Sequence, residues 1–136
     1  KLVIRPHPLK DIGEKELAQK LDPEIKVVVG GSILPLIKSS SLVVVTDNSS
    51  VILEALALKK PVISIKIDKD LVDDEFCNSN ACIRTSIQDF ESNLSKILEN
   101  DQFRNLILQN GKTFLDENLA NQGLASINTI KFLDNL

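Results

Sequence analysis

Short apolar runs rich in Val and Ile alternate with segments of helical periodicity, and this alternation constrains the fold more than any other feature of the chain. The runs expected to form strands are 2–5, 25–29, 42–45, 61–65 and 81–84. The segments expected to form helices are 13–21, 33–39, 50–59, 87–98, 101–115 and 124–136. Strands that alternate with helices favour a parallel sheet, and near-continuous apolar strands fit burial on both faces. We therefore expect an α/β fold in a single domain over residues 1–136: a Rossmann-like parallel sheet with helices on both faces and a helical C-terminus.

Length and charge exclude several classes of protein. The 136 residues are enough for one domain with a hydrophobic core. The formal net charge is −3 and both signs are spread along the sequence, so we expect no nucleic-acid partner. The absence of Tyr and Trp also removes rings on which single-stranded bases stack. No apolar run approaches the roughly 20 residues of a membrane span and no signal peptide is visible, so we expect a cytoplasmic location.

Metal-binding patterns are weak in this sequence. Two cysteines, Cys77 and Cys82, and a single histidine cannot complete a four-ligand structural zinc site. Free thiols in a reducing compartment are the simpler interpretation of the cysteines, and a disulfide that closes the short loop between them is the alternative. The acidic residues within 70–75 lack the spacing of an EF-hand, so we expect a solvated loop and no metal ligands there.

The turn at residues 46–50, Thr-Asp-Asn-Ser-Ser, carries the strongest functional pattern. It follows the apolar run 42–45 and leads directly into an almost wholly apolar helical segment. Backbone N–H groups and hydroxyls at a helix N-terminus attract phosphate and other anions. An ordinary N-cap formed by Ser49 or Ser50 is the simpler interpretation.

Glu54 is the only ionisable residue between 51 and 58. It lies four residues after Ser50, which corresponds to about 6 Å of helical rise. A diphosphate bound at Ser49 and Ser50 would place an attached ribose near this carboxylate, which can accept hydrogen bonds from two ribose hydroxyls. The alternative is an exposed Glu54, or one paired with Lys59 or Lys60.

Two further segments follow expected strands. The single histidine, His7, lies between two prolines after the first strand, and Arg5 precedes it by two residues. The two prolines stiffen the backbone around His7, which favours a histidine that acts as a general base or, when protonated, neutralises phosphate. The alternative is an ordinary surface histidine. Gly30-Gly31-Ser32 follows the second strand and allows close backbone approach or a simple turn. Ligands of open α/β sheets bind at the carboxyl ends of strands, so we expect all three segments to face one crevice.

Segments 5–8, 41–50 and 54–63 resemble the C-terminal, donor-binding half of GT-B glycosyltransferases. The likeness is strongest to surface-polysaccharide transferases and to the CDP-glycerol glycerophosphotransferase group. UDP-N-acetylglucosamine 2-epimerases are similar, and the segment 121–127 is similar to the Asp-Gly-Lys-Ala-Ser segment before the final helix of some of these proteins. Two departures stand out: Lys59 replaces a usual Gly, and Asn121 replaces a usual Asp.

The resemblance implies one half of a GT-B fold and a role for each matching position. It implies that Ser49 and Ser50 bind the donor diphosphate and that Glu54 holds the ribose. The other positions it assigns to the donor site are Gly31, Ser32, Asp47 and Asn48. His7, together with Arg5, is assigned to neutralising donor phosphate or to the chemistry itself.

The resemblance also implies a substrate and a partner domain. The donor would be UDP- or CDP-linked, with no cofactor and no catalytic metal. Since Lys1 already lies in a strand-like run and Met is absent, we interpret the chain as a fragment that lacks an N-terminal acceptor domain. The full protein would build a cell-surface polysaccharide or a teichoic-acid-like polymer and could associate peripherally with the inner face of the membrane. The fragment alone should bind nucleotide weakly and catalyse nothing.

Two alternatives remain open from the sequence. One is an epimerase of the same fold that acts on UDP-N-acetylglucosamine, with its proton-abstracting carboxylates in the missing half. The other is a non-catalytic α/β module that binds a nucleotide or a protein. Nucleotide binding that stays intact in Glu54→Ala would contradict the donor-site interpretation.

Overall fold

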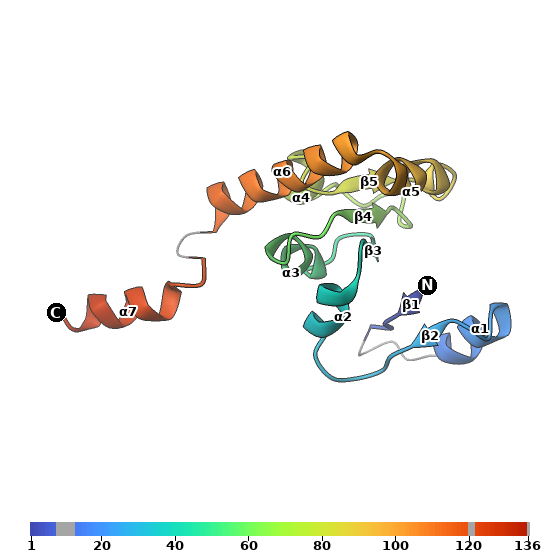
Figure 1. The fold of residues 1–136 in the computed structure, drawn as a ribbon, viewed down its shortest axis with the longest axis horizontal. Helices are drawn as coiled ribbons and strands as arrows, with labels where there is room; N and C mark the ends of the chain where they lie inside the picture. Colours follow the sequence, from blue (N-terminus) through green and yellow to red (C-terminus); the bar gives the residue numbers. More distant parts are fainter. Residues whose placement is uncertain (8–12, 120–121, 136) are drawn as a thin grey trace. The chain divides into compact units, whose positions relative to one another are not determined.

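The computed structural model describes residues 1–7, 13–119 and 122–135. The chain forms two compact units, residues 1–33 and 34–136, and each is described by itself. Figure 1 shows the elements in chain order, coloured from the N-terminus to the C-terminus. The expected α/β class is confirmed, and each expected strand and helix is present with ends that shift by a few residues.

The first unit contains two parallel strands and one helix. Strand β1 (Val3–Ile4) pairs with β2 (Lys26–Val27), with Val3 opposite Lys26 and Ile4 opposite Val27. Helix α1 (Glu14–Leu21) connects them and begins after Gly13, whose φ of 70° is left-handed. Within α1, Ala18 is buried. Because the strands are parallel, their carboxyl ends lie at the same edge of this small sheet.

The second unit is built on three parallel strands in the order β3-β4-β5. They are β3 (Val43–Thr46), β4 (Val62–Ile65) and β5 (Ile83–Thr85). The helices of this unit are α2 (Leu34–Ser39), α3 (Val51–Ala57), α4 (Glu75–Asn78), α5 (Phe90–Glu99), α6 (Asp101–Asn118) and α7 (Ala125–Leu133). Helix α3 contacts β3 and β4, α5 contacts β4 and β5, and α6 packs against α3 and α5.

The sequence predicted one parallel sheet, but the strands form two parallel sheets. Among the described residues, β2 pairs with β1 and β3 pairs with β4. The strands of the first sheet have only two residues each, so each edge offers few backbone groups for a further ladder. Periodicity predicted the strands and their parallel direction but not this division.

The core of the second unit lies around the central strand β4. Val62, Ile63 and Ser64 of β4 are fully buried, as are Ile52 of α3 and Ile97 of α5. A central strand is covered by its neighbours along both edges and by helices, so its side chains leave water more completely than those of β3. The sequence Val-Ile-Ser-Ile of this strand therefore places one hydroxyl in an apolar interior.

Helix α4 lies between the expected strands 61–65 and 81–84, where the sequence predicted no helix, and this prediction was wrong at residues 75–78. Asp74 caps the helix, because its carboxylate accepts a hydrogen bond from the N–H of Cys77 at 3.1 Å. A helix of a single turn is too short to produce a hydrophobic period, which explains why the pattern did not reveal it.

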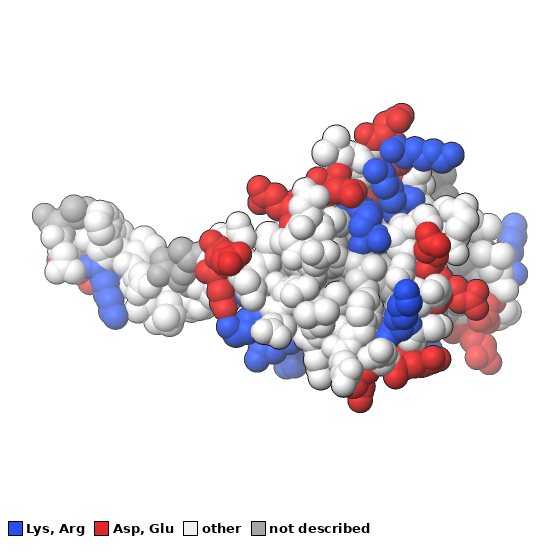
Figure 2. Space-filling view, turned by 90° about the horizontal axis from the view of Figure 1, so that it is seen from above, with Lys and Arg blue, Asp and Glu red and all other residues white. Residues whose placement is uncertain are grey.

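The surface and the last helix add two observations. Acidic and basic side chains are interspersed on the face drawn in Figure 2. Helix α7 is present as expected, but its apolar residues Ile127, Ile130, Phe132 and Leu133 are at least half exposed. None of the helices in the described ranges has the length and apolar character required to cross a bilayer.

Helix α3 ends in a Schellman motif with a lysine in the left-handed position. Lys59 has φ 55°, its N–H donates to the carbonyl of Leu56 at 2.9 Å, and the N–H of Lys60 donates to that of Ala55 at 2.9 Å. The resemblance places a Gly at residue 59, and the structure shows why a Gly fits there. A side chain with a Cβ atom is strained in this conformation by roughly 1 kcal/mol.

We expect Lys59→Gly to raise the free energy of unfolding by about 1 kcal/mol, which corresponds to about 3 °C in Tm. The physical reason is relief of the Cβ strain at φ 55°. Urea unfolding measures the change, and Lys59→Ala is the matched control because alanine removes the charge but keeps the Cβ. Equal stabilisation by Ala and Gly would show that the lysine charge, and not the backbone, sets the effect.

Candidate functional site

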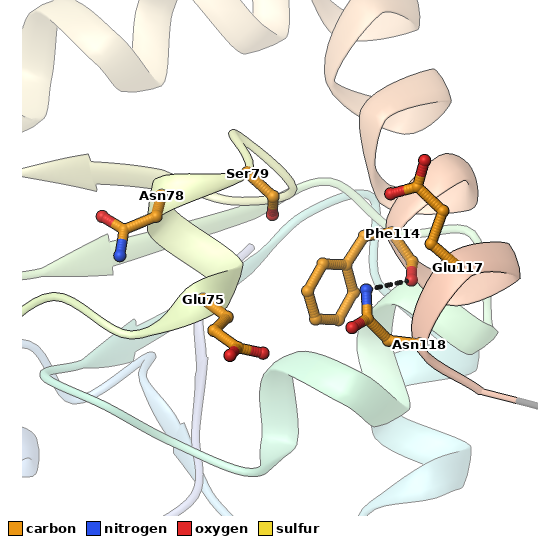
Figure 3. A pocket seen from close by; sticks show the side chains of 6 residues that line it. All are labelled: Glu75, Asn78, Ser79, Phe114, Glu117 and Asn118. Carbon is orange, nitrogen blue, oxygen red and sulfur yellow. Dashed lines mark hydrogen bonds between the residues drawn. The ribbon is translucent and has the colours of Figure 1, made fainter.

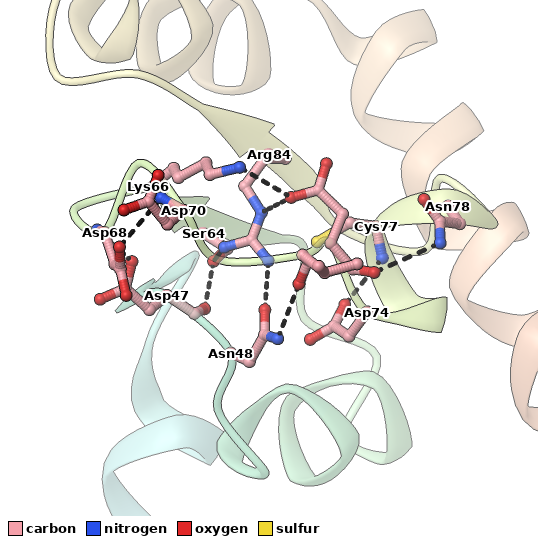
Figure 4. Close-up of polar contacts among 12 residues, drawn as sticks. Asp47, Asn48, Ser64, Lys66, Asp68, Asp70, Asp74, Cys77, Asn78 and Arg84 are labelled. Atoms are coloured by element: carbon pink, nitrogen blue, oxygen red, sulfur yellow. Dashed lines mark hydrogen bonds and ion pairs between the residues drawn. The ribbon is translucent and has the colours of Figure 1, made fainter.

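Polar side chains gather at the carboxyl ends of β3, β4 and β5 around a single guanidinium (Figure 4). We call this group the Arg84 network; its members are Asp47, Asn48, Ser64, Lys66, Asp73 and Arg84. Because the three strands are parallel, residues far apart in sequence reach the same edge of the sheet. The network therefore connects the loop after β3, the loop after β4 and strand β5.

Arg84 makes three separate contacts in the network. Its Nη1 donates to Ser64 Oγ at 2.7 Å, and its Nη2 donates to Asn48 Oδ1. Its Nε lies 3.1 Å from Asp73 Oδ1, an ion pair that lacks the alignment of a hydrogen bond. Lys66 Nζ lies 3.9 Å from the same Asp73 oxygen. The side chain of Arg84 is 12% exposed and that of Asp73 40%, but the two paired atoms, Nε and Oδ1, are themselves buried.

Asp47 anchors the turn after β3 to the loop after β4. Its Oδ1 accepts hydrogen bonds from the N–H groups of Asp68 at 3.0 Å and Ile67 at 2.7 Å. These two backbone bonds are the main cause that lowers the pKa of the Asp47 carboxyl, with smaller contributions from Arg84 and Lys66. Asp47 itself has φ 51°, and its carbonyl accepts a hydrogen bond from Ser64 Oγ at 2.6 Å.

Both the oxygen and the nitrogen of the Asn48 side-chain amide form hydrogen bonds. Its Oδ1 accepts from Arg84, and its Nδ2 donates to the carbonyl of Val72 at 3.2 Å. The sequence assigned Asp47 and Asn48 to the donor site. The structure gives both side chains internal partners, so their observed contacts hold the turn in position.

Ser50 and Glu54 are exposed, whereas Ser49 is half-buried. Ser49 Oγ accepts a long hydrogen bond of 3.4 Å from the N–H of Val51, so Ser49 acts as the cap of α3. Ser50 already has helical dihedral angles and makes no capping hydrogen bond. Glu54 is exposed, as one form of the alternative interpretation held, and within the described part of the chain it forms no ion pair with Lys59 or Lys60.

The residues after β1 and β2 meet within the first unit. Arg5 donates from Nη1 to the carbonyl of Gly30 at 2.5 Å and from Nη2 to that of Gly31 at 2.7 Å. Both glycines have φ 74°, which glycine adopts without strain. His7 is exposed, as is Ser32. Pro8 lies outside the described residues, as does Asn121 of the segment 121–127.

The structure thus brings together two sets of predicted residues, one in each unit. Arg5 and Gly31 are in direct contact in the first unit, and Asp47 to Ser50 share one turn in the second. The crevice shared by all three segments stays a prediction. No group of three His, Cys, Asp or Glu side chains in the described ranges is arranged to hold a metal ion.

A separate pocket lies between α4 and α6 (Figure 3). Its lining residues are Glu75, Asn78, Ser79, Phe114, Glu117 and Asn118. Asn118 Nδ2 donates to the carbonyl of Phe114 at 2.9 Å, and two carboxylates stand at the rim. None of the residues predicted from the sequence lines this pocket.

Sequence reasoning missed Arg84, Ser64 and Asp73. The signal that could have identified the first two was a polar residue inside each of two expected strands, 61–65 and 81–84. A hydroxyl or guanidinium inside an apolar strand needs a hydrogen-bond partner when it is buried. Asp73 gave no such signal, because it lies among several acidic residues of a polar loop.

Comparisons with protein-family models, with curated proteins and with solved structures found no match to this chain.

Proposed function

We propose that this chain is the donor-binding half of a GT-B glycosyltransferase or glycerophosphotransferase. The full protein would transfer a sugar or a glycerol-phosphate-like group from a UDP- or CDP-linked donor to a cell-surface glycan or polyol-phosphate acceptor. The observation that carries the proposal is the pair formed by Ser50 and Glu54. Both are exposed, and Glu54 of α3 lies one helical turn after Ser50, which directly precedes this helix.

The start of α3 offers donors for a diphosphate. The N–H groups of Ser49 and Ser50 donate no hydrogen bond within the described residues, while those of Ile52 and Leu53 bond to the carbonyls of Ser49 and Ser50. Free N–H groups and the helix dipole favour an anion at such an end. A ribose attached to that anion would lie about 6 Å along the helix, within reach of Glu54.

The internal contacts of Asp47 and Asn48 refine their proposed roles. Asp47 holds the turn to the N–H groups of Ile67 and Asp68, and Asn48 holds it to Arg84. Their proposed role is therefore to present the serines in a fixed geometry, which lowers the cost of ordering the turn around a ligand.

For the first unit, the proposal keeps the roles that the resemblance implies. Arg5 would support the turn at Gly31 and Ser32, since it already binds the carbonyls of both glycines. His7 would neutralise donor phosphate in the cleft that the acceptor half completes. In this proposal the helix dipole and basic side chains stabilise the leaving diphosphate. The reaction would take place on the cytoplasmic side of the membrane.

Calorimetric titration of the chain with UDP, CDP and GDP tests the proposal. We expect one nucleotide to bind, and we expect Glu54→Gln to weaken its binding by about 10- to 100-fold. Hydrogen bonds to a charged group contribute about 1.5–3 kcal/mol, and each 1.4 kcal/mol corresponds to a factor of ten in Kd. Ser50→Pro should also weaken binding, because proline removes the backbone donor but fits the first helical turn.

Two surface variants serve as matched controls. Glu91→Gln and Ser92→Ala change exposed residues in the first turn of α5 and should leave Kd unchanged. Binding that survives Glu54→Gln and Ser50→Pro would place the nucleotide elsewhere and refute the assigned site. If UDP, CDP and GDP all fail to bind at millimolar concentration, the donor-domain proposal fails for this chain.

A further inference from the structure

Cys77 and Cys82 are brought into contact by the fold. Their Sγ atoms are 3.2 Å apart, and both cysteines are free thiols. Cys77 lies on α4, and Cys82 comes directly before β5. A disulfide requires an S–S distance of about 2.05 Å, so the two sulfur atoms need to approach by only about 1 Å.

The backbone imposes this contact independently of the thiols. The N–H groups of Ala81 and Cys82 both donate to the carbonyl of Phe76, at 2.9 and 3.2 Å. Asn80 has φ 57°, the left-handed conformation that reverses the chain after α4. Because the turn is already closed by main-chain hydrogen bonds, little conformational entropy remains to be lost when the sulfur atoms join.

The two thiols differ in access. Cys77 is half-buried, whereas Cys82 is buried with 3% of its surface exposed. The hydrogen bond to Cys77 and burial both raise the pKa of the Cys82 thiol; Asp74 adds to this and Arg84 opposes it. An oxidant in solution would therefore meet Cys77 first.

We propose that Cys77 and Cys82 form a thiol-oxidation site that a low-molecular-weight disulfide converts into an intramolecular disulfide. The thiolate of Cys77 attacks the small disulfide, forms a mixed disulfide and releases one small thiol. Cys82 then loses its proton to water and attacks the Sγ of Cys77, which releases the second small thiol. Two protein thiols are oxidised to one disulfide, and one small disulfide is reduced to two thiols.

The disulfide would join two segments that lie next to the Arg84 network in the sequence. Asp73 lies two residues before α4, and Arg84 lies two residues after Cys82. A covalent link between α4 and the start of β5 would oppose opening of this segment, so its amide protons should exchange more slowly with solvent in the oxidised protein.

Incubation of the chain with oxidised glutathione, followed by mass spectrometry after alkylation, tests the site. We expect the native chain to lose both thiols together and to accumulate little glutathione adduct. Cys82→Ala should accumulate a stable adduct on Cys77, because the second thiol is missing. Cys77→Ala should form an adduct at least about tenfold more slowly than Cys82→Ala, because Cys82 is buried.

Each result bears directly on the proposal. A native chain that keeps one or two glutathione adducts, or that forms intermolecular disulfides, would refute intramolecular closure. Equal rates of adduct formation in Cys77→Ala and Cys82→Ala would refute the order of attack. If Cys82→Ala fails to fold by circular dichroism, peptide mapping of the oxidised native chain decides the question, since a 77–82 bridge must be present and must be reversed by dithiothreitol.

Discussion

Replacing Arg84 with methionine is expected to lower the free energy of unfolding by about 3 kcal/mol. The change removes hydrogen bonds to Ser64 and Asn48 and the ion pair with Asp73, and it leaves these polar groups without their partner. Hydrogen bonds to charged groups contribute about 1.5–3 kcal/mol each, and breaking a buried ion pair costs about 3–5 kcal/mol. The expected value lies below the sum of these contributions, because Ser64 still donates to the carbonyl of Asp47 and Asn48 still donates to that of Val72.

Urea unfolding followed by circular dichroism measures this change, and two variants make the measurement specific. Arg84→Lys keeps the charge but cannot make all three contacts. Its free energy of unfolding should therefore lie between that of the native chain and that of Arg84→Met. Arg104→Met removes a partly exposed arginine that pairs with the exposed Asp101 on α6, and such surface pairs contribute less than about 1 kcal/mol. A loss in Arg84→Met no larger than that in Arg104→Met would show that the network does not stabilise the fold.

Replacing Gly111 with valine is also expected to lower the free energy of unfolding by about 3 kcal/mol. Gly111 is buried in α6 where this helix packs against α3. A Cβ atom added at Gly111 would lie 2.8 Å from Leu56 Cδ2, closer than packed carbon atoms approach. Valine adds two further methyl groups, and Leu56 is itself 6% exposed, so relief requires the Leu56 side chain to change conformation inside a packed interior or the two helices to separate.

A double-mutant cycle with Leu56→Ala tests the assigned clash. The loss caused by Gly111→Val should be smaller in the Leu56→Ala background by at least about 1 kcal/mol, because the truncated side chain makes room. Thr113→Val, an exposed change of similar shape on the same helix, should alter stability by no more than about 0.5 kcal/mol. Equal losses in both backgrounds would mean that Leu56 is not the residue that excludes the side chain.

Most of the secondary structure could be predicted because it is encoded locally. The runs 42–45 and 61–65 coincide with β3 and β4 to within one residue, and 101–115 lies wholly within α6. Each of these features depends on residues within one or two turns of each other, so the pattern of side chains carries the information.

The candidate site was predictable only in part, because hydrogen-bond partners come from distant segments. The turn 46–50 was identified correctly as a polar turn between a strand and a helix. The partners of its side chains were not identified: Arg84 is 36 residues from Asn48, and Ile67 is 20 residues from Asp47. A carboxylate in a turn can face a ligand or the backbone of a neighbouring loop, and local sequence does not distinguish the two cases.

The sequence by itself determined the order and type of most elements and the polar turn at 46–50 between a strand and a helix. Helical and strand periods are properties of neighbouring residues, so they can be read without knowing the fold. The tertiary structure alone decided that the strands form two parallel sheets, that Arg84 joins the ends of three strands, and that Cys77 and Cys82 touch. These features arise where the chain returns after a crossover or a tight turn, and the pairing there depends on packing between segments that no local period describes.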